Sequence, residues 1–301
     1  QLADYVIDRH YPDIAAAGST PGRELPENRY LALFQAVAEA QARLVARWMH
    51  IGFIHGVMNT DNVSIAGETI DYGPCAFMDR YVPGTVFSSI DTQGRYAYAN
   101  QPVIAQWNLT RFAETLLSIV APDVDRATEL LTEAIKTFST TYQHHWLAGM
   151  RRKLGMATAT AGDLDLINQL FAAMDGQNAD YTLVFRRLSD AIRGQDDPVT
   201  SLFDDTSAIA NWVEQWRGRL DQEDVVPNVR ATAMDQVNPI YIPRNHKVEE
   251  ALTAAVENND LARFNKLLDI VKQPFVEQAG QEDYASPAPT SDVPYRTFCG
   301  T

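Results

Sequence analysis

The sequence has few cysteines, few basic residues and no long apolar runs. Its 301 residues include only two cysteines, Cys75 and Cys299, too few for a disulfide framework, so a reducing compartment is expected. Lys and Arg number 25 against 39 for Asp and Glu, which gives a formal net charge of −14. Because an acidic surface repels phosphate backbones, nucleic acid is not expected as a partner. No apolar run reaches the roughly 20 residues of a transmembrane helix, so no membrane partner is expected.

Apolar residues make up 46% of the chain, and this proportion is typical of a packed globular protein. The length suits one large domain or two smaller ones. The chain begins at Gln1, without an initiator Met or a signal peptide, and we expect the numbering to start inside a longer protein.

Apolar residues recur at helical spacing through most of the chain. Gly52 is the predicted C-cap of the longest early helix. A loop rich in Gly and Pro is expected at 18–28, and an irregular segment at 72–103. Helices are predicted over 1–17, 29–52, 104–120, 123–154, 163–175, 179–193 and 205–221, and as a pair around Asn258-Asn259.

Two short strands are predicted within 63–71, joined by a tight turn at Ala66-Gly67. The last stretch, 276–301, is acidic and rich in Pro, which predicts a flexible tail. In the pair of helices before it, one set of apolar residues is predicted to face inward. This set is Leu252, Val256, Leu261, Phe264, Leu267, Leu268 and Val271.

The segment around the predicted hairpin follows the order of a protein kinase active site. Kinases carry H-R-D-x-x-x-x-N, then a hairpin and D-F-G. Here His55 precedes Asn62 by the same interval, and Asp71 opens "DYG" after the predicted hairpin. Asn62 and Asp71 would supply the oxygen ligands that Mg²⁺ needs, and His55 is expected to brace the loop. The sequence therefore predicts a mainly α fold with a small β-hairpin, a kinase-like C-lobe followed by a helical C-terminal extension.

One departure from the kinase pattern decides how the motif is interpreted. Val57 stands where a kinase has its catalytic Asp, and a valine cannot accept a proton. The nearest carboxylate is Asp61, beside Asn62. Either the protein is an inactive kinase or its chemistry is rearranged. Taken alone, Asp61 and Asn62 could also be turn formers.

The motif "GFIHGVMNTDN…TIDYGP" resembles the selenoprotein O family of kinase-like proteins. The resemblance implies a protein adenylyltransferase, which transfers AMP from ATP to Ser, Thr or Tyr hydroxyls of proteins with Mg²⁺, or Mn²⁺ in its place. It assigns Asp61 as the base and Asn62 and Asp71 as metal and nucleotide ligands. The resemblance continues through "GRYAYANQPVIAQWNLTRFAETL", "KLGM", "DYTLVFRRLS", "NPIYIPRNH" and the Cys near the C-terminus.

Members of that family also carry a nucleotide-binding lobe ahead of this segment. No Gly-rich loop or V-A-I-K-like strand precedes residue 50, so the N-terminal lobe is expected to be missing from this chain. We expect the chain alone to bind ATP weakly and not to turn over. The compartment would be cytoplasmic in a bacterium and mitochondrial in a eukaryote. Three parts are predicted: a kinase-like helical lobe at 1–225, a helical extension at 226–275 and the tail at 276–301 with Cys299.

The resemblance further implies redox control through the near-terminal Cys299. Some members link that position to a cysteine whose expected counterpart here is Phe87, so Cys75 is the substitute candidate. The alternative for Cys75 is a small buried thiol. The basic run Arg151-Arg152-Lys153 is expected to be a solvated helix face. Two other functions stay open: phosphate transfer by a kinase-like enzyme, and an inactive scaffold.

Overall fold

The computed structural model describes residues 1–17, 28–289, 291 and 293–298, and most of the predicted loop at 18–28 lies outside them. It is mainly helical with a small two-stranded antiparallel sheet, which confirms the predicted mainly α fold class, while the kinase-like C-lobe stays a prediction. The elements are α1 Leu2–His10, α2 Pro12–Ala17, α3 Arg29–Ile51, β1 Phe53–Ile54, η1 Thr60–Asn62, β2 Ala76–Phe77, η2 Tyr98–Asn100, α4 Gln101–Val120, α5 Val124–Lys153, α6 Asp163–Met174, α7 Tyr181–Ile192, α8 Asp197–Thr200, α9 Thr206–Leu220, α10 Pro227–Asp235, α11 Asn245–Asn258, α12 Ala262–Val271 and α13 Glu282–Ala285.

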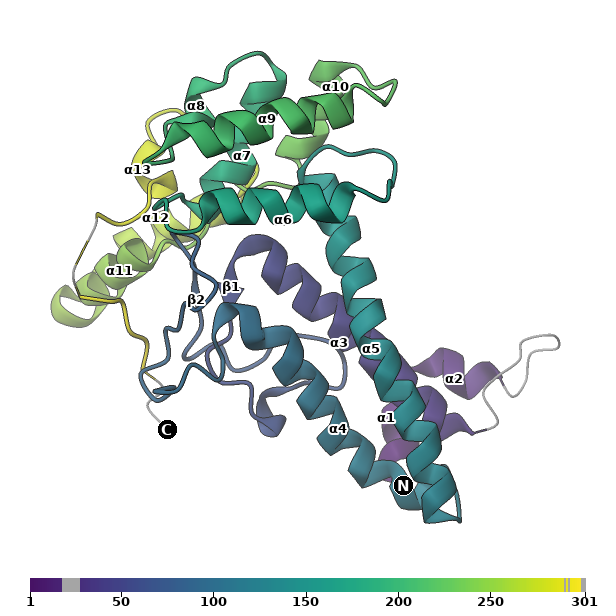
Figure 1. Cartoon of the computed structure of the whole chain (residues 1–301). Helices are drawn as coiled ribbons and strands as arrows, with labels where there is room; N and C mark the ends of the chain where they lie inside the picture. Colours follow the sequence, from purple (N-terminus) through teal and green to yellow (C-terminus); the bar gives the residue numbers. More distant parts are fainter. Residues whose placement is uncertain (18–27, 290, 292, 299–301) are drawn as a thin grey trace.

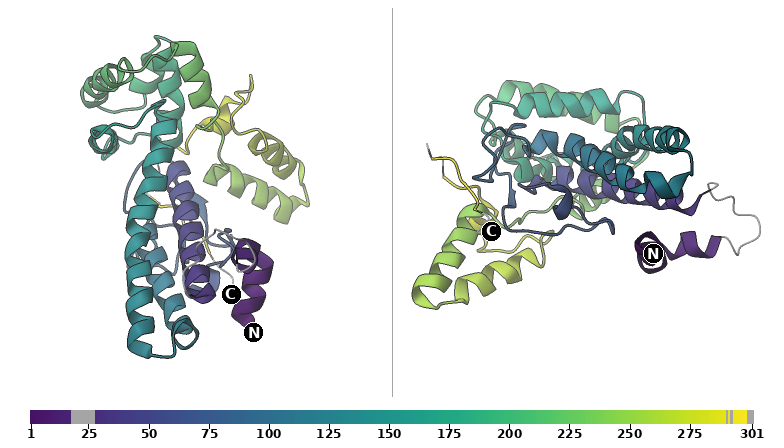
Figure 2. Two further views of the ribbon diagram at one scale, coloured as in Figure 1. Left: turned by 90° about the vertical axis from the view of Figure 1, so that its right-hand side faces the viewer. Right: turned by 90° about the horizontal axis from the view of Figure 1, so that it is seen from below.

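Three long helices, α3, α4 and α5, pack against one another and form one half of the molecule (Figure 1). Helices α6 to α10 are grouped around the far end of α5. The pair α11 and α12 extends to one side of this body (Figure 2). None of the described helices is long and apolar enough to cross a membrane. The sheet lies where these three parts meet, and its loop runs along α3 and α4.

Helix α3 begins and ends at local signals in the sequence. Asn28 accepts a hydrogen bond from the Tyr30 amide at 2.8 Å and so satisfies a free N–H of the first turn. Gly52 has a φ of +70°, and its amide donates to the Trp48 carbonyl, as in a left-handed helix cap. The predicted C-cap is confirmed. The buried face of α3 includes Leu33 and Val37, in agreement with the apolar spacing.

The predicted strands at 63–71 are wrong, and the sheet lies outside that segment. β1 pairs antiparallel with β2, with Phe53 opposite Phe77. The segment between them turns at Gly67, but its polar groups bond to side chains of α3: Gln41 donates to the Ser64 carbonyl at 2.6 Å, and the Trp48 indole donates to Thr69 at 2.9 Å. Because these partners come from a distant helix, the alternation of residues in the segment could not reveal them.

The apolar face predicted for the helix pair α11 and α12 is largely exposed. Leu252, Val256, Leu261 and Phe264 are 50%, 83%, 56% and 47% exposed, whereas Leu267 is buried. Helical spacing shows which residues share a face, but another element must cover that face before it is buried. Helix α10 was also missed, because one of its buried residues is the charged Arg230, so that apolar spacing does not mark its buried face.

The basic run at the end of α5 is only in part the solvated face that was predicted, because Arg152 is exposed but its two neighbours are not. Arg151 bonds to the Asp163 carboxylate at 2.6 Å, and Lys153 is only 4% exposed. The Lys153 ammonium lies 4.2 Å from the centroid of the Phe185 ring and makes no ion pair with any described residue. Burial lowers the pKa of Lys153 to about 7.

Replacing Lys153 by methionine is expected to raise the free energy of unfolding at pH 7 by about 1–3 kcal/mol, because the apolar side chain has no charge to desolvate. The unfolded chain holds the Lys153 proton up to its ordinary pKa of 10.5, whereas the folded chain loses it near 7. The stabilising effect should therefore be full below pH 7 and fade as the pH rises toward 10.5. Denaturant unfolding at several pH values would measure this, and a destabilised variant at neutral pH would contradict it.

Candidate functional site

The predicted catalytic and metal-binding residues lie on one loop, residues 55–75, which β1 and β2 close at its base. Asp61 and Asn62 belong to the 3₁₀ turn Thr60–Asn62, and Asp71 lies further along the same loop. Because β1 and β2 pair, the two ends of the loop are adjacent. The relative positions of these side chains are therefore set by the whole loop between β1 and β2, and not by a hairpin between Asn62 and Asp71.

His55 braces the loop from within the protein, the role expected for it. It is 1% exposed, and its Nε2 lies 2.9 Å from the carbonyl of Ile70, directly before Asp71. The Val57 amide donates to Nδ1, so we assign the proton to Nε2 as the donor to Ile70. Burial lowers the pKa of His55, which keeps the ring neutral at physiological pH.

The side chains of Asn62 and Asp71 are placed differently. The Asn62 amide nitrogen donates to the Val57 carbonyl at 3.1 Å, which leaves Oδ1 as the group that can bind a cation. Asp71 is exposed and has a φ of +54°, the left-handed conformation that a non-glycine residue adopts at a cost. Aspartate and asparagine adopt this conformation more readily than other non-glycine residues, and Asn178 and Asn259 adopt it in this chain as well. Asp61 is also exposed.

Two buried amides on α4 hold the start of the loop, and sequence reasoning missed both. Gln101 accepts from the His55 amide and donates to the Phe53 carbonyl, each at 2.9 Å. Asn108 donates to the Met58 carbonyl at 3.0 Å. One signal in the sequence could have revealed them: both amide residues fall on the apolar face of an amphipathic helix, where a buried amide needs a hydrogen-bond partner. Gln101 and Asn108 are positioning residues for the loop.

The donor set of the loop suits a hard divalent cation. Two carboxylates, Asp61 and Asp71, and the Asn62 amide oxygen are the ligands that Mg²⁺ or Mn²⁺ accepts, and Mg²⁺ commonly keeps water and phosphate as its other ligands. No group of three His, Cys, Asp or Glu side chains that could hold a metal occurs among the described residues. Asp61, Asn62 and Asp71 are therefore candidate ligands only, and metal binding at this loop stays a prediction.

The C-terminal segment lies beside the loop. Thr297 pairs with Ser88 as a parallel bridge, and its hydroxyl donates to the Pro74 carbonyl at 2.7 Å. Phe87 packs edge-on against Tyr295, with ring centroids 5.8 Å apart. Cys299 lies outside the described residues, so its pairing with Cys75 and the redox role of both cysteines stay predictions. The division of the chain into three parts also stays a prediction.

Cys75 is partly buried, and burial raises the pKa of its thiol to about 11. Only the thiolate reacts with iodoacetamide, so in a Cys299→Ser variant we expect Cys75 to react slowly at neutral pH. The rate should rise with pH toward 11, and at neutral pH it should increase on unfolding. Mass spectrometry of timed samples measures this, and rapid labelling of the folded variant at pH 7 would contradict it.

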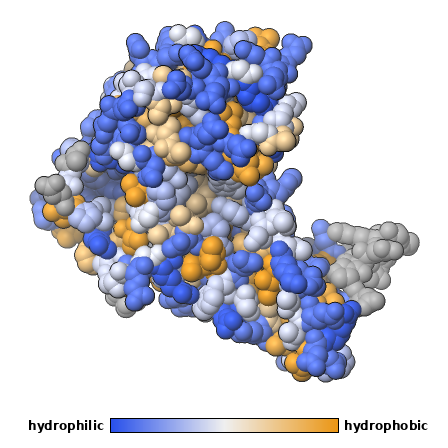
Figure 3. Space-filling model, in the orientation of Figure 1, coloured by the Kyte–Doolittle hydropathy of each residue, from blue (hydrophilic) through white to orange (hydrophobic). Residues whose placement is uncertain are grey.

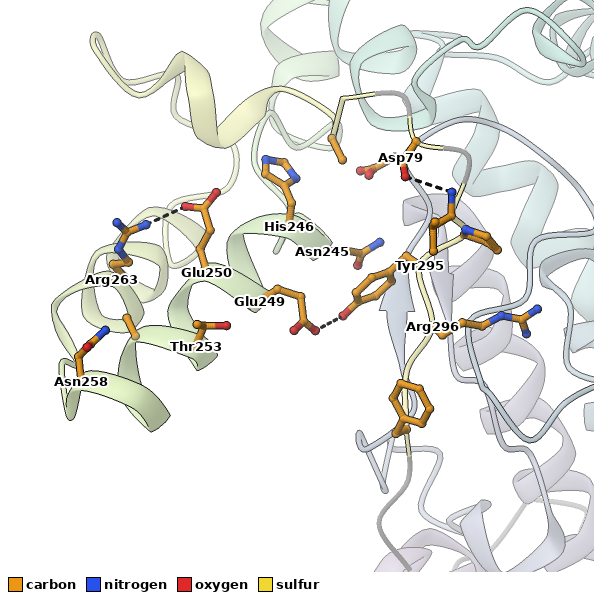
Figure 4. Close-up of a pocket in the computed structure, with 16 residues that line it drawn as sticks. Asp79, Asn245, His246, Glu249, Glu250, Thr253, Asn258, Arg263, Tyr295 and Arg296 are labelled. Atoms are coloured by element: carbon orange, nitrogen blue, oxygen red, sulfur yellow. Dashed lines mark hydrogen bonds and ion pairs between the residues drawn. The ribbon is translucent and has the colours of Figure 1, made fainter.

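A cavity of about 1060 Å³ is next to the loop rather than on it. It lies between α11 and the C-terminal segment (Figure 4). Tyr295 donates to Glu249 at 2.8 Å across it, and Arg263 pairs with Glu250 at 3.1 Å within it. A second cavity of about 500 Å³ connects Tyr72 and Cys75 with the same segment. The face shown in Figure 3 is mostly hydrophilic, with small separate apolar patches.

Fold and loop together define a mainly helical protein whose two-stranded sheet closes a loop rich in carboxylate and amide oxygens. Residues 1–272 match the family model described as "Protein adenylyltransferase SelO", and the chain belongs to this family. It is 51% identical over 302 residues to a protein of Rhizobium rhizogenes and 55% identical over 302 residues to one of Cereibacter sphaeroides. Both relatives are named "Protein nucleotidyltransferase YdiU". The alignments cover 100% of this chain but 58% and 59% of the relatives.

Proposed function

We propose that this chain carries the metal-binding loop of a protein nucleotidyltransferase that transfers AMP from Mg²⁺-ATP to Ser, Thr or Tyr hydroxyls of acceptor proteins. The family match and the relatives' names support nucleotidyl transfer. The observation that carries the proposal is the placement of Asp61, Asn62 and Asp71 on one braced loop, with Val57 at the position of the kinase base. Mn²⁺ could replace Mg²⁺ in the same ligand set.

In this proposal the loop residues have separate roles. Bound Mg²⁺ would neutralise charge on the nucleotide phosphates. Asn62 and Asp71 hold the metal and, through it, the nucleotide. Asp61 accepts the proton of the acceptor hydroxyl while that oxygen bonds to the α-phosphorus. The bond from the α-phosphorus to the bridging oxygen breaks, and pyrophosphate leaves with the electron pair.

The chain spans about 58–60% of the length of the curated relatives it matches. We propose that residues of an N-terminal lobe complete the nucleotide site, and that the 301 residues alone bind ATP weakly without turnover. Isothermal titration of ATP into the 301-residue chain tests this. Micromolar affinity would contradict it.

The reaction type is tested with ATP labelled at either the α or the γ phosphate. The 301-residue chain and a longer protein containing it are each incubated with labelled ATP, Mg²⁺ and an acceptor protein mixture. The longer protein is expected to transfer label from the α position only. Transfer from the γ position alone would indicate kinase activity, and no transfer from either would indicate a scaffold; both outcomes contradict the proposal.

A further inference from the structure

Three exposed side chains, Arg95, Trp107 and Arg111, gather beside the metal loop and have no role in the proposed reaction; we call them the Trp107 patch. The guanidinium carbons of Arg95 and Arg111 lie 4.7 and 5.6 Å from the centroid of the Trp107 ring. Trp107 is 40% exposed. Arg111 pairs with Glu114 at 2.8 Å, whereas Arg95 makes no ion pair with any residue that the structure describes. On a chain with a net charge of −14, Arg95 is thus an exposed cation without an ionic partner among the described residues.

Hydrogen bonds fix the patch relative to Asp61. Tyr96, which follows Arg95, donates its hydroxyl to Asn59 at 2.6 Å, and Asn59 precedes the turn that carries Asp61. The Asp91 carboxylate accepts from the amides of Arg95 and Tyr96 at 2.9 and 2.8 Å. The backbone of Arg95 is thus tied to the predicted catalytic loop, and its side chain lies over Trp107.

A pocket of about 270 Å³ connects the patch with the loop, because Arg111 and Thr60 both line it. Its other walls are mostly apolar, among them Val63 and Phe112. Asn108 also lines it; its amide nitrogen donates to two carbonyls, and its Oδ1 is a buried acceptor without a partner among the described residues. The pocket has room for a large apolar side chain and carries a guanidinium at its edge.

We propose that the Trp107 patch and this pocket dock an acidic segment of the acceptor protein, with an aromatic side chain in the pocket and carboxylates on Arg95 and Arg111. The inference rests on the proposed function, since it places the acceptor beside Asp61. Guanidinium groups bind carboxylates through paired, charge-assisted hydrogen bonds, and the acidity of the remaining surface disfavours an acidic segment elsewhere.

The test is fluorescence anisotropy without nucleotide, using a labelled peptide that contains Ser, Tyr and several Glu residues. Comparison peptides carry Lys in place of Glu, or Ala in place of Tyr. The Glu peptide is expected to bind about 10-fold more tightly than the Lys peptide and to weaken with added salt. Arg111→Gln and Trp107→Leu should each lower its affinity about 5- to 10-fold.

Arg126→Gln is the matched control, because Arg126 is also an exposed arginine paired with a glutamate three residues on, at 2.6 Å. It should leave binding unchanged. Thr115→Trp, at an exposed position lining the pocket, should remove the advantage of the Tyr peptide over the Ala peptide. Circular dichroism verifies that the variants are folded. Equal binding of the Glu and Lys peptides, or Arg111→Gln binding like the unsubstituted chain, would overturn the proposal.

Because peptide binding needs no ATP, this inference and the proposed function can fail separately. Selective peptide binding without transfer of α label would support the proposed docking surface and contradict the proposed reaction. Transfer of α label without selective peptide binding would retain the reaction and reject the docking surface.

Discussion

Substituting asparagine for Asp71 is expected to lower AMP transfer by the longer protein about 100-fold or more without unfolding it. In the proposed reaction the substitution would remove the anionic metal ligand, and a metal ion contributes several kcal/mol to charge stabilisation in such reactions. Asparagine suits this position because, like aspartate, it tolerates the left-handed conformation that Asp71 adopts. Alanine would add backbone strain and so confuse a chemical effect with a structural one.

The measurement is transfer of α label at several Mg²⁺ concentrations. Asp71→Asn should also weaken Mg²⁺-dependent nucleotide binding, whereas Asp61→Asn should reduce transfer about 10²- to 10⁴-fold and leave that binding unchanged, because a base acts only on the proton. Asp269→Asn, an exposed site on α12, is the control and should behave like the unsubstituted protein. Full activity of Asp71→Asn would show that the loop is not the metal site.

Replacing Arg244 by methionine is expected to lower the free energy of unfolding by about 3–5 kcal/mol, the largest stability change we anticipate. Arg244 is fully buried and reaches Asp180 at 2.6 Å and Asp79 at 2.7 Å. It also donates to the Ala285 carbonyl. Its loss leaves Asp180, itself 2% exposed, as a buried carboxylate without a cation. Through these contacts Arg244 links three parts of the chain, which are the segment after β2, the start of α7, and helix α13.

The pH dependence of this variant gives a second readout. Burial raises the pKa of Asp180, and Arg244 opposes that shift. Without Arg244 the folded state should bind a proton at Asp180 more readily, so the deficit relative to the unsubstituted chain should shrink as the pH falls. Adding Asp180→Asn to Arg244→Met should recover part of the loss, because the buried charge is gone.

Denaturant unfolding followed by circular dichroism measures both effects. Arg263→Met is the control, since Arg263 forms an exposed ion pair with Glu250 and such pairs contribute little. A loss for Arg244→Met no larger than that for Arg263→Met would contradict the role given to the buried cluster.

The residues of the loop could be selected from the sequence, whereas the groups that support the loop could not. His55, Asn62 and Asp71 are recognised by their order and spacing alone, and the structure places all three on one loop, with His55 in the expected bracing role. Gln101 and Asn108 could not be assigned, because each bonds to backbone groups about 50 residues away. Such pairs depend on how α4 packs against the loop.

The sequence by itself determined features whose causes lie within a few residues. The cap residues Asn28 and Gly52 set the ends of α3, and apolar spacing placed most of the helices near their observed bounds. Only the tertiary structure decided that β1 pairs with β2, that Arg244 is buried among carboxylates and that the shared apolar face of α11 and α12 is largely exposed. Each of these depends on which distant residues come into contact, and local propensity and periodicity carry no information on that.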